Sequence, residues 1–304
     1  MTAAAGVQAG ARELGDRGGG WRSRLLTALL VLPASIWYLF LLVLPLAIVV
    51  IFSFGVRGAR GGFTPAFTLD NYANIFRAVG VDPFINSLWM AAAGTVGCLL
   101  VGLPLAYYIA TRAGSRKGLF ILLLVIPFWV SFLIRTYAWF LILDPQLAVA
   151  AVRDLFGNPD FNLLGTPWAV LIGLIYGYLP LMVFPLYVTL ERMDRTLLEA
   201  SKDLGAGRWG TFRQVTLPIA LPGLVTGSIL VFIPMMGEFV IPQILGYGRT
   251  FLVGNALYLD FLEFRNWPAG AAKAVVLIAV MLVTVTFYLW FINRGRRTRE
   301  ASVL

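Results

Sequence analysis

The sequence predicts an all-α protein that crosses a membrane six times. Hydrophobic residues make up 59% of the 304 residues and charged residues only 13%, with a mean hydropathy of +0.82. A soluble globular chain carries about 25% charged residues, so this composition excludes that class. Six segments reach or approach the roughly 20 apolar residues that cross the hydrocarbon core. Basic residues cluster in alternate connections between these segments.

The six predicted spans follow one another along most of the chain. They are residues 25–54, 86–111, 119–143, 168–190, 217–245 and 271–292. Several contain proline inside the apolar run, at Pro45, Pro104, Pro127, Pro180, Pro185 and Pro234. A membrane helix tolerates proline because neighbouring helices satisfy the carbonyl groups that it frees. We therefore expect kinked helices, which suit a moving pore.

Both ends of the chain are predicted to lie outside the membrane. Residues 1–24 are rich in glycine and alanine and predict a disordered cytoplasmic tail, and residues 294–304 form a basic tail. Arg22 and Arg24 precede the first apolar run, as they would in a signal peptide. That run is longer than a signal peptide needs and lacks a small-residue cleavage site at its start. We expect a retained first helix and one membrane domain, residues 25–293.

The distribution of lysine and arginine predicts the orientation of the spans. Most of the 24 basic residues lie in four stretches, 12–24, 112–117, 192–213 and 294–299. The opposite side carries fewer, namely Arg57, Arg60, Arg77, Arg153, Arg249 and Arg265. By the positive-inside rule, both termini and the loop at 191–216 are cytoplasmic. The net charge of +9 thus indicates topology, and no basic patch with interleaved aromatic residues points to a nucleic-acid partner.

Several kinds of chemistry are excluded by what the sequence lacks. It contains no histidine, and its one cysteine, Cys98, lies inside a predicted span. A His or Cys metal site, an internal disulfide and a His-dependent catalytic triad are therefore absent. No phosphate-binding Gly-x-x-x-x-Gly-Lys-Ser/Thr loop is present either. We expect no catalytic residues, no metal and no cofactor on this chain.

The loop at residues 191–216 predicts a helix, a fixed bend and a second helix. Apolar and small residues recur at helical spacing from 195 to 204, at Leu197, Leu198, Ala200, Ser201 and Leu204. Gly205 follows directly and is typical of a left-handed helix cap, after which residues 208–216 begin a second helix. Periodicity alone is equally compatible with an ordinary amphipathic loop at the membrane surface.

Two ionisable residues fall inside predicted spans. Arg135 lies eight residues before the outer end of the third span and Glu238 seven before that of the fifth, so both lie in the outer half at similar depth. Each is costly there unless it is paired or hydrated. One interpretation is a buried ion pair between them. The other is that Glu238 faces a translocation path and contacts a cationic solute, with aromatic faces from Tyr137, Trp139 and Phe239 beside it.

Three further charges lie near the outer ends of the spans. Asp260 and Glu263 are three residues apart, so on a helical turn they share a face near the mouth of a path. Such a pair could attract a dication, although a solvated loop face is the alternative. Lys273 is expected to extend its amine to the membrane interface.

The loop has a spacing that resembles a known signature. It reads Glu199-Ala200-Ser201, three residues, Gly205, nine residues, Val215, one residue, Leu217-Pro218. Membrane subunits of binding-protein-dependent ATP-driven importers carry Glu-Ala-Ala, Gly and Ile-x-Leu-Pro at the same separations, so Ser201 and Val215 are departures. The resemblance implies the type I importer permease fold, with the loop as a coupling helix. It also implies partners: two ATPase subunits that bind the ATP, a second permease and an extracytoplasmic solute-binding protein.

Other strings resemble a narrower group, the polyamine importer permeases. They are residues 131–139, Gly237-Glu238-Phe239-Val240-Ile241-Pro242 with Leu245-Gly246, and Arg265-Asn266-Trp267-Pro268. The resemblance implies import of putrescine or spermidine across a bacterial inner membrane. Ferric-iron, sulfate and sugar importers share the signature loop and remain alternatives for the solute. A proton-coupled secondary transporter with Glu238 as proton carrier is a rival that leaves the loop unexplained.

Overall fold

The computed structural model describes residues 21–144, 146 and 162–301. It divides into two units, residues 1–52 and residues 53–304, and each is described by itself. In the first unit, α2 (Trp21–Tyr38) continues through a π-helical stretch, η1 (Leu39–Val43), into α3 (Leu44–Ser53). The π stretch precedes Pro45, and Leu44 donates its N–H five residues back to Leu39. This wider turn accommodates a proline that has no N–H to donate.

The second unit begins with a small hairpin and a short helix. Strands β1 (Val56–Arg57) and β2 (Phe63–Thr64) pair antiparallel, with Val56 opposite Thr64, and α4 (Asp70–Ile75) follows. The long helices come next. They are α5 (Ala78–Thr111), a 3-10 turn η2 (Gly114–Arg116), α6 (Lys117–Val125), a 3-10 turn η3 (Ile126–Trp129), α7 (Phe132–Leu143) and α9 (Pro167–Glu191).

The rest of the unit alternates short and long helices. The loop after α9 contains α10 (Arg195–Asp203), α11 (Arg208–Thr211) and a π-helical turn η4 (Phe212–Thr216), which runs directly into α12 (Leu217–Met236). Next come α13 (Val240–Leu245), α14 (Val253–Tyr258), a π-helical turn η5 (Leu259–Glu263) and α15 (Trp267–Ala301).

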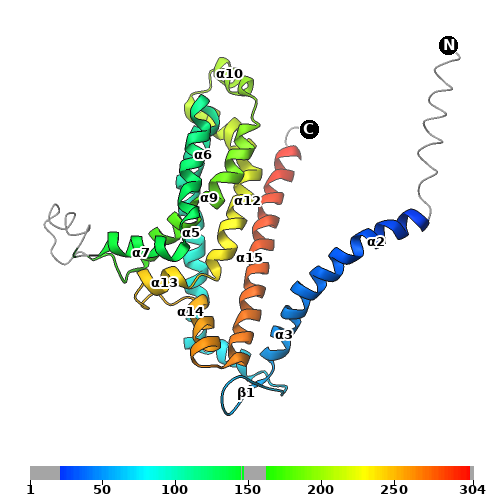
Figure 1. Cartoon of the computed structure of the whole chain (residues 1–304). Coiled ribbons are helices and arrows are strands. Elements are labelled where there is room, and N and C mark those ends of the chain that lie inside the picture. The colour runs from blue at the N-terminus through cyan, green and yellow to red at the C-terminus, as the bar shows by residue number, and fades with distance from the viewer. Residues whose placement is uncertain (1–20, 145, 147–161, 302–304) are drawn as a thin grey trace. The chain divides into compact units, whose positions relative to one another are not determined.

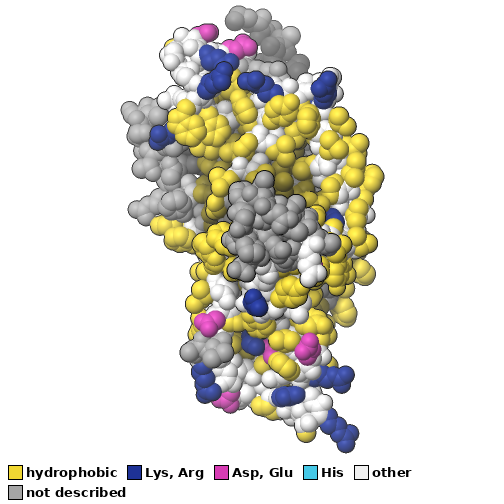
Figure 2. Space-filling model, turned by 90° about the vertical axis from the view of Figure 1, so that its left-hand side faces the viewer, with side chains coloured by type: hydrophobic (Ala, Val, Ile, Leu, Met, Phe, Trp, Pro, Cys, Tyr) yellow, Lys and Arg dark blue, Asp and Glu magenta, His cyan; other side chains and the backbone are white. Residues whose placement is uncertain are grey.

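The core of the second unit lies where α5, α9 and α12 pack along their lengths (Figure 1). Leu174, Met182 and Met235 are fully buried there. Glycines allow the backbones to approach, as small residues do in membrane helix pairs. A Cβ at Gly223 of α12, for example, would lie 2.5 Å from the carbonyl oxygen of Pro185 in α9. Hydrophobic side chains cover much of the middle of the face in Figure 2, with basic side chains toward its ends.

The described helices agree with a polytopic membrane protein. Five are long and apolar enough to cross a membrane: Leu25–Ser53, Gly80–Thr111, Pro167–Glu191, Arg208–Met236 and Trp267–Trp290. The bent pair Gly114–Trp129 and Phe132–Leu143 makes six if it counts as one span. The expected all-α fold is therefore confirmed.

Two spans that the sequence predicted as continuous are broken in the structure. The segment 119–143 turns by 96° after η3, so that α7 lies across the direction of the long helices (Figure 1). Pro127 removes one N–H from the helical ladder, and Val130 and Ser131 are extended. The segment 217–245 ends its first helix at Met236 and starts again at Val240. Arg135 therefore lies in the crossing helix α7, and Glu238 lies at a break.

The two ends of the chain are described only in part. Residues 1–20 and 302–304 lie outside the described residues. Within those described, α2 already begins at Trp21 and α15 continues to Ala301, so part of each predicted tail is helical.

Candidate functional site

The loop between α9 and α12 has the helix–bend–helix form that the sequence predicts. Asp194 caps α10, because its carboxylate accepts the backbone N–H of Thr196 at 3.0 Å. That bond holds the pKa of Asp194 below its usual range. Gly205 ends the helix with φ +81°, and a Cβ there would meet no atom within 4 Å. Backbone conformation, and not space, therefore requires glycine at this position.

The second half of the loop is fastened to α10. The hydroxyl groups of Ser201 and Thr211 lie 3.2 Å apart and are buried, and Ala206 donates its N–H to the carbonyl of Ser201 at 3.0 Å. The serine that departs from the Glu-Ala-Ala pattern thus makes a bond that alanine could not make. The two short helices consequently form one body.

This body presents apolar side chains to the outside. Leu204 is 89% exposed and Trp209 74% exposed, and the ring of Trp209 stacks on Phe212. A groove of about 450 Å³ runs between the two arms of the loop. Its lining consists of Leu197, Ala200, Ser201, Leu204, Gly205, Ala206, Gln214 and Val215. Exposed leucine and tryptophan beside a groove form a surface that fits a partner protein.

The remaining residues of the loop signature lie around this groove. Glu199 is exposed on α10, and Val215 is half-buried in η4. Leu217 and Pro218 are half-buried and start α12. A force on the loop is thereby applied directly to α12, because no flexible link separates η4 from that helix.

Glu238 occupies the break between α12 and α13 and is only 7% exposed. Its Oε1 accepts the backbone N–H groups of Phe239, Val240 and Ile241 at 3.0, 2.9 and 3.4 Å. Its Oε2 accepts the hydroxyl of Tyr178 on α9. The side chain therefore starts α13 in the way that an N-terminal cap does and fastens the break to α9.

Helix α14 supports the same break from the other side. Asn255, which is buried, donates to the carbonyl of Phe239 at 3.1 Å and to the side-chain oxygen of Gln243 at 3.2 Å. A Cβ at Gly254 would lie 2.5 Å from the carbonyl oxygen of Glu238, so the two backbones touch. Ser87 of α5 accepts the N–H of Val253 and ties α14 to the core.

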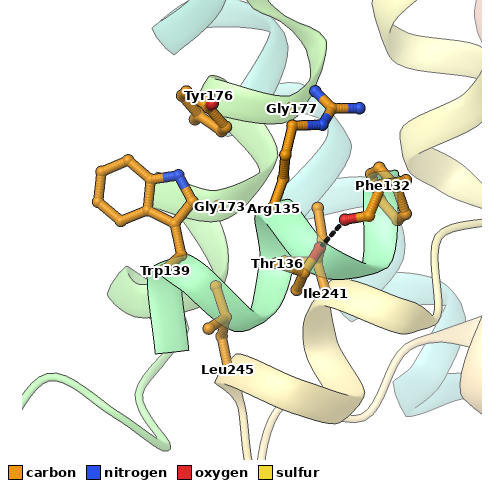
Figure 3. A pocket seen from close by; sticks show the side chains of 9 residues that line it. All are labelled: Phe132, Arg135, Thr136, Trp139, Gly173, Tyr176, Gly177, Ile241 and Leu245. Atoms are coloured by element: carbon orange, nitrogen blue, oxygen red, sulfur yellow. Dashed lines mark hydrogen bonds between the residues drawn. The ribbon is translucent and has the colours of Figure 1, made fainter. Parts of the chain in front are cut away.

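Arg135 extends from α7 toward Gly177 of α9, between Phe132 on one side and Trp139 and Tyr176 on the other (Figure 3). Its guanidinium lies 4.6 Å from the ring centre of Phe128 and 5.7 Å from that of Phe132. The Nε atom is buried without a hydrogen-bond partner. The cavity beside it holds about 10 Å³, close to the minimum for a single water.

The ion pair between Arg135 and Glu238 is not formed. Among the described residues, two ion pairs occur, Lys117 with Glu191 and Lys273 with Asp260. Glu238 is instead satisfied by neutral donors and Arg135 by aromatic faces. Of the two interpretations that the sequence allowed, the structural pairing is therefore wrong.

The aromatic residues named beside these charges lie in different settings. Trp139 packs edge-on against Tyr176 at 5.3 Å, whereas Tyr137 is 56% exposed on α7. Phe239 is 39% exposed, and its ring stacks on that of Tyr258.

The acidic pair at the end of α14 does not form a shared face. Asp260 is 6% exposed and pairs with Lys273 at 2.6 Å, while Glu263 is exposed. The turn that carries both residues, η5, is π-helical and not α-helical. The amine of Lys273 pairs with Asp260, and its expected position at the membrane interface stays a prediction.

Comparison with known proteins identifies the family. A family model described as the inner membrane component of binding-protein-dependent transport systems matches residues 99–297, more than half of the chain. The chain belongs to this family. It is thus the permease subunit of an ABC transporter and an inner-membrane protein.

Several relatives of this permease have been named. The spermidine/putrescine transport system permease protein PotB of Salmonella typhimurium is 36% identical over 260 residues, covering 85% of this chain and 90% of that protein. PotB of Escherichia coli is 35% identical over 85% of this chain and 94% of that protein. The alpha-glucoside permease AglG of Rhizobium meliloti is 29% identical over 79% of this chain and 63% of that protein.

Solved structures confirm the permease fold. A chain of a bacterial ABC transporter that imports alginate superposes with a TM-score of 0.70 at 19% identity, covering 90% of this chain and 96% of that chain. A chain of the MetNI methionine transporter gives 0.53 at 21% identity, over 71% of this chain and 94% of that chain. At these identities the likeness concerns the fold alone.

Sequence reasoning missed the partners of Glu238 in this permease. Its side-chain partner, Tyr178, is a neutral residue in a predicted span, and the residues that support the break from the other side, Asn255 and Tyr258, lie in the predicted connection between the fifth and sixth spans. A signal was present in Gly237, which directly precedes an acidic residue and a restart of the apolar run, as a helix start would.

Proposed function

We propose that this chain imports polyamines, putrescine first and spermidine second. The observation that carries the proposal is the 35–36% identity to PotB proteins over 85% of the chain. It extends through both helix breaks and the loop, so it covers the parts that would move and the parts that would meet the solute.

The proposed assembly contains this permease, a second similar permease and two cytoplasmic ATPase subunits, and a binding protein delivers the solute from outside. ATP binds to the partner subunits, and this chain itself carries no cofactor. Both termini and the loop at 191–216 face the cytoplasm. Closure of the ATPases moves α10 and η4, and through them α12, so that the two permeases rock about a central path.

Glu199 and Gly205 have separate roles in this proposal. Glu199 is exposed and available to a donor on the ATPase, and Gly205 fixes the angle between the two arms of the groove. Ala200, Ser201 and Val215 line the groove that receives the partner. Leu217 and Pro218 transmit the movement to α12.

The proposed path passes the two helix breaks. Glu238 and Phe239 lie at one of them, and Tyr137 follows the other with an exposed ring. Arg135 and Trp139 are assigned to holding α7 against α9 beside the path. Glu263 remains an exposed anion near the outer end, whereas Asp260 is neutralised by Lys273.

The test is ATP hydrolysis by the complex that copurifies with the intact chain, reconstituted with its binding protein. Putrescine and spermidine should stimulate hydrolysis, and ferric iron, sulfate and an alpha-glucoside should not. The alpha-glucoside is included because AglG is a relative of this chain. Stimulation by the alpha-glucoside alone would show that the solute is a sugar. Failure of any ATPase to copurify would contradict the assembly itself.

A further inference from the structure

The rings of Phe239 and Tyr258 form a stacked pair at the break between α12 and α13. Their centres lie 5.5 Å apart with an angle of 18° between the planes. Both are partly open, Phe239 at 39% and Tyr258 at 37% exposure. The pair therefore offers aromatic surface to whatever occupies the space beside it.

The pair is held in place by buried polar contacts. Asn255 and Tyr258 are three residues apart on α14 and so point to one side of it. Asn255 fixes Phe239 through its carbonyl and Gln243 through its side chain, and its own Oδ1 accepts the N–H of Leu252 at 3.2 Å. This network sets the rings before any solute arrives, which lowers the entropy cost of binding.

The carboxylate of Glu238 belongs to the residue next to Phe239 in the chain, at the same helix break. The Glu238 carboxylate accepts its neighbour Phe239's N–H, and all the donors that it has in the structure are neutral groups. Neither ion pair found among the described residues includes Glu238. Hydrogen bonds satisfy its lone pairs but do not cancel its charge, which acts strongly in a medium of low dielectric constant.

We propose that the Phe239–Tyr258 pair, backed by the Glu238 carboxylate, holds one ammonium group of the transported amine. This inference rests on the proposed function and assigns the site that recognises the solute. Ring faces attract a cation through their quadrupole, and the buried carboxylate adds to the same field. A neutral sugar would lose the attraction from both, and an anion would be repelled by both. The guanidinium of Arg135 above the ring of Phe128 is a cation–π contact that this structure already contains.

The test replaces the rings by fluorinated phenylalanines, which weaken the quadrupole at nearly constant size. Tyr258→Phe is the reference variant for position 258, because it keeps the ring and removes only the hydroxyl group. Fluorination at 239 or 258 should raise the KM for putrescine uptake stepwise with the number of fluorine atoms, because each fluorine weakens the ring quadrupole further. Removing a ring, in Phe239→Leu or Tyr258→Leu, should raise KM by roughly 2- to 30-fold, the range that a cation–π contact of about 0.5–2 kcal/mol gives.

Phe287 provides the matched control. It stacks on Trp290 with an angle of 30° and is 63% exposed, on a part of α15 without a carboxylate beside it. Fluorination there should leave KM unchanged. If fluorination at 239 and 258 has no more effect than at 287 while the unmodified importer takes up putrescine, the inference is overturned and the proposed function stands. If the unmodified importer takes up no amine, both are overturned.

Discussion

At the scale of single residues, the two charged side chains that the sequence places at membrane depth are stabilised by different partners. Glu238 takes four neutral hydrogen-bond donors, and Arg135 takes two aromatic rings. Asp260 and Lys273 instead form a direct pair, with side chains 8% and 24% exposed. Asp260 and Lys273 are therefore coupled directly, whereas Glu238 and Arg135 are not.

Double-variant cycles should separate these two cases. Asp260→Asn or Lys273→Met alone should lower stability by about 3 kcal/mol, because each leaves a largely buried charge unpaired, and the double variant should recover much of it. Arg135→Gln and Glu238→Gln should add within about 0.5 kcal/mol, as independent sites do. Thermal unfolding of the purified chain measures both. Recovery in the Arg135/Glu238 double variant would contradict the contacts described for them.

Glu238 itself should respond differently to two substitutions. Glu238→Ala leaves three backbone N–H groups and the Tyr178 hydroxyl without an acceptor, which should cost about 2–4 kcal/mol. Glu238→Gln retains an acceptor for the backbone groups and should cost less than half of that. The same unfolding measurement distinguishes them, and equal losses would show that an amide oxygen at 238 cannot replace the carboxylate as acceptor.

At the scale of elements, the loop at 191–216 is the part that the sequence predicted best. Helical periodicity and one glycine sufficed, because the structure there is set by residues close to one another in the chain. The breaks in the third and fifth spans were not predicted. The turn in the third span follows Pro127, a residue that many membrane helices tolerate without breaking. The break in the fifth span is fastened by Tyr178 and Asn255, which come from other helices.

Two substitutions in the loop should uncouple the importer. Gly205→Val introduces a branched side chain at positive φ, a strain of about 1 kcal/mol or more that changes the angle between the arms of the groove. Glu199→Lys reverses an exposed charge and leaves the helix intact. Both variants should reach the membrane in normal amounts, which immunoblotting checks, and should lose putrescine uptake. Gly207→Ala, at ordinary φ and in open space, is the matched control and should keep uptake.

At the scale of the whole molecule, the loop with α10 and the end of α15 lie at one end of the helices, and η5 lies at the other (Figure 1). The basic residues predict the same two groupings, and which end faces the cytoplasm stays a prediction. Composition and charge could predict this grouping, because they depend on the requirements of a bilayer and not on particular side-chain contacts. The solute-contacting residues could not be found in this way, since they depend on which short helices meet.

Cysteine labelling should test the orientation. The one native cysteine, Cys98, is fully buried and should not react. A cysteine introduced at Leu204, which is 89% exposed, should react with a membrane-impermeant maleimide only in inside-out vesicles. Glu263→Cys should react in right-side-out vesicles. The reverse pattern would invert the predicted topology.

The turn after η3 has a consequence for the bilayer itself. Helix α6 and η3, with 9 and 4 residues, rise about 22 Å together, less than the roughly 30 Å of a hydrocarbon core. If Lys117 lies at the membrane surface, the extended backbone at Val130 and Ser131 lies at a depth where acyl chains offer no hydrogen bonds. Lipid offers no hydrogen-bonding groups to this backbone, so water or a neighbouring protein must cover it. Beside α7, this chain therefore depends on water or a partner protein to satisfy its backbone hydrogen bonds.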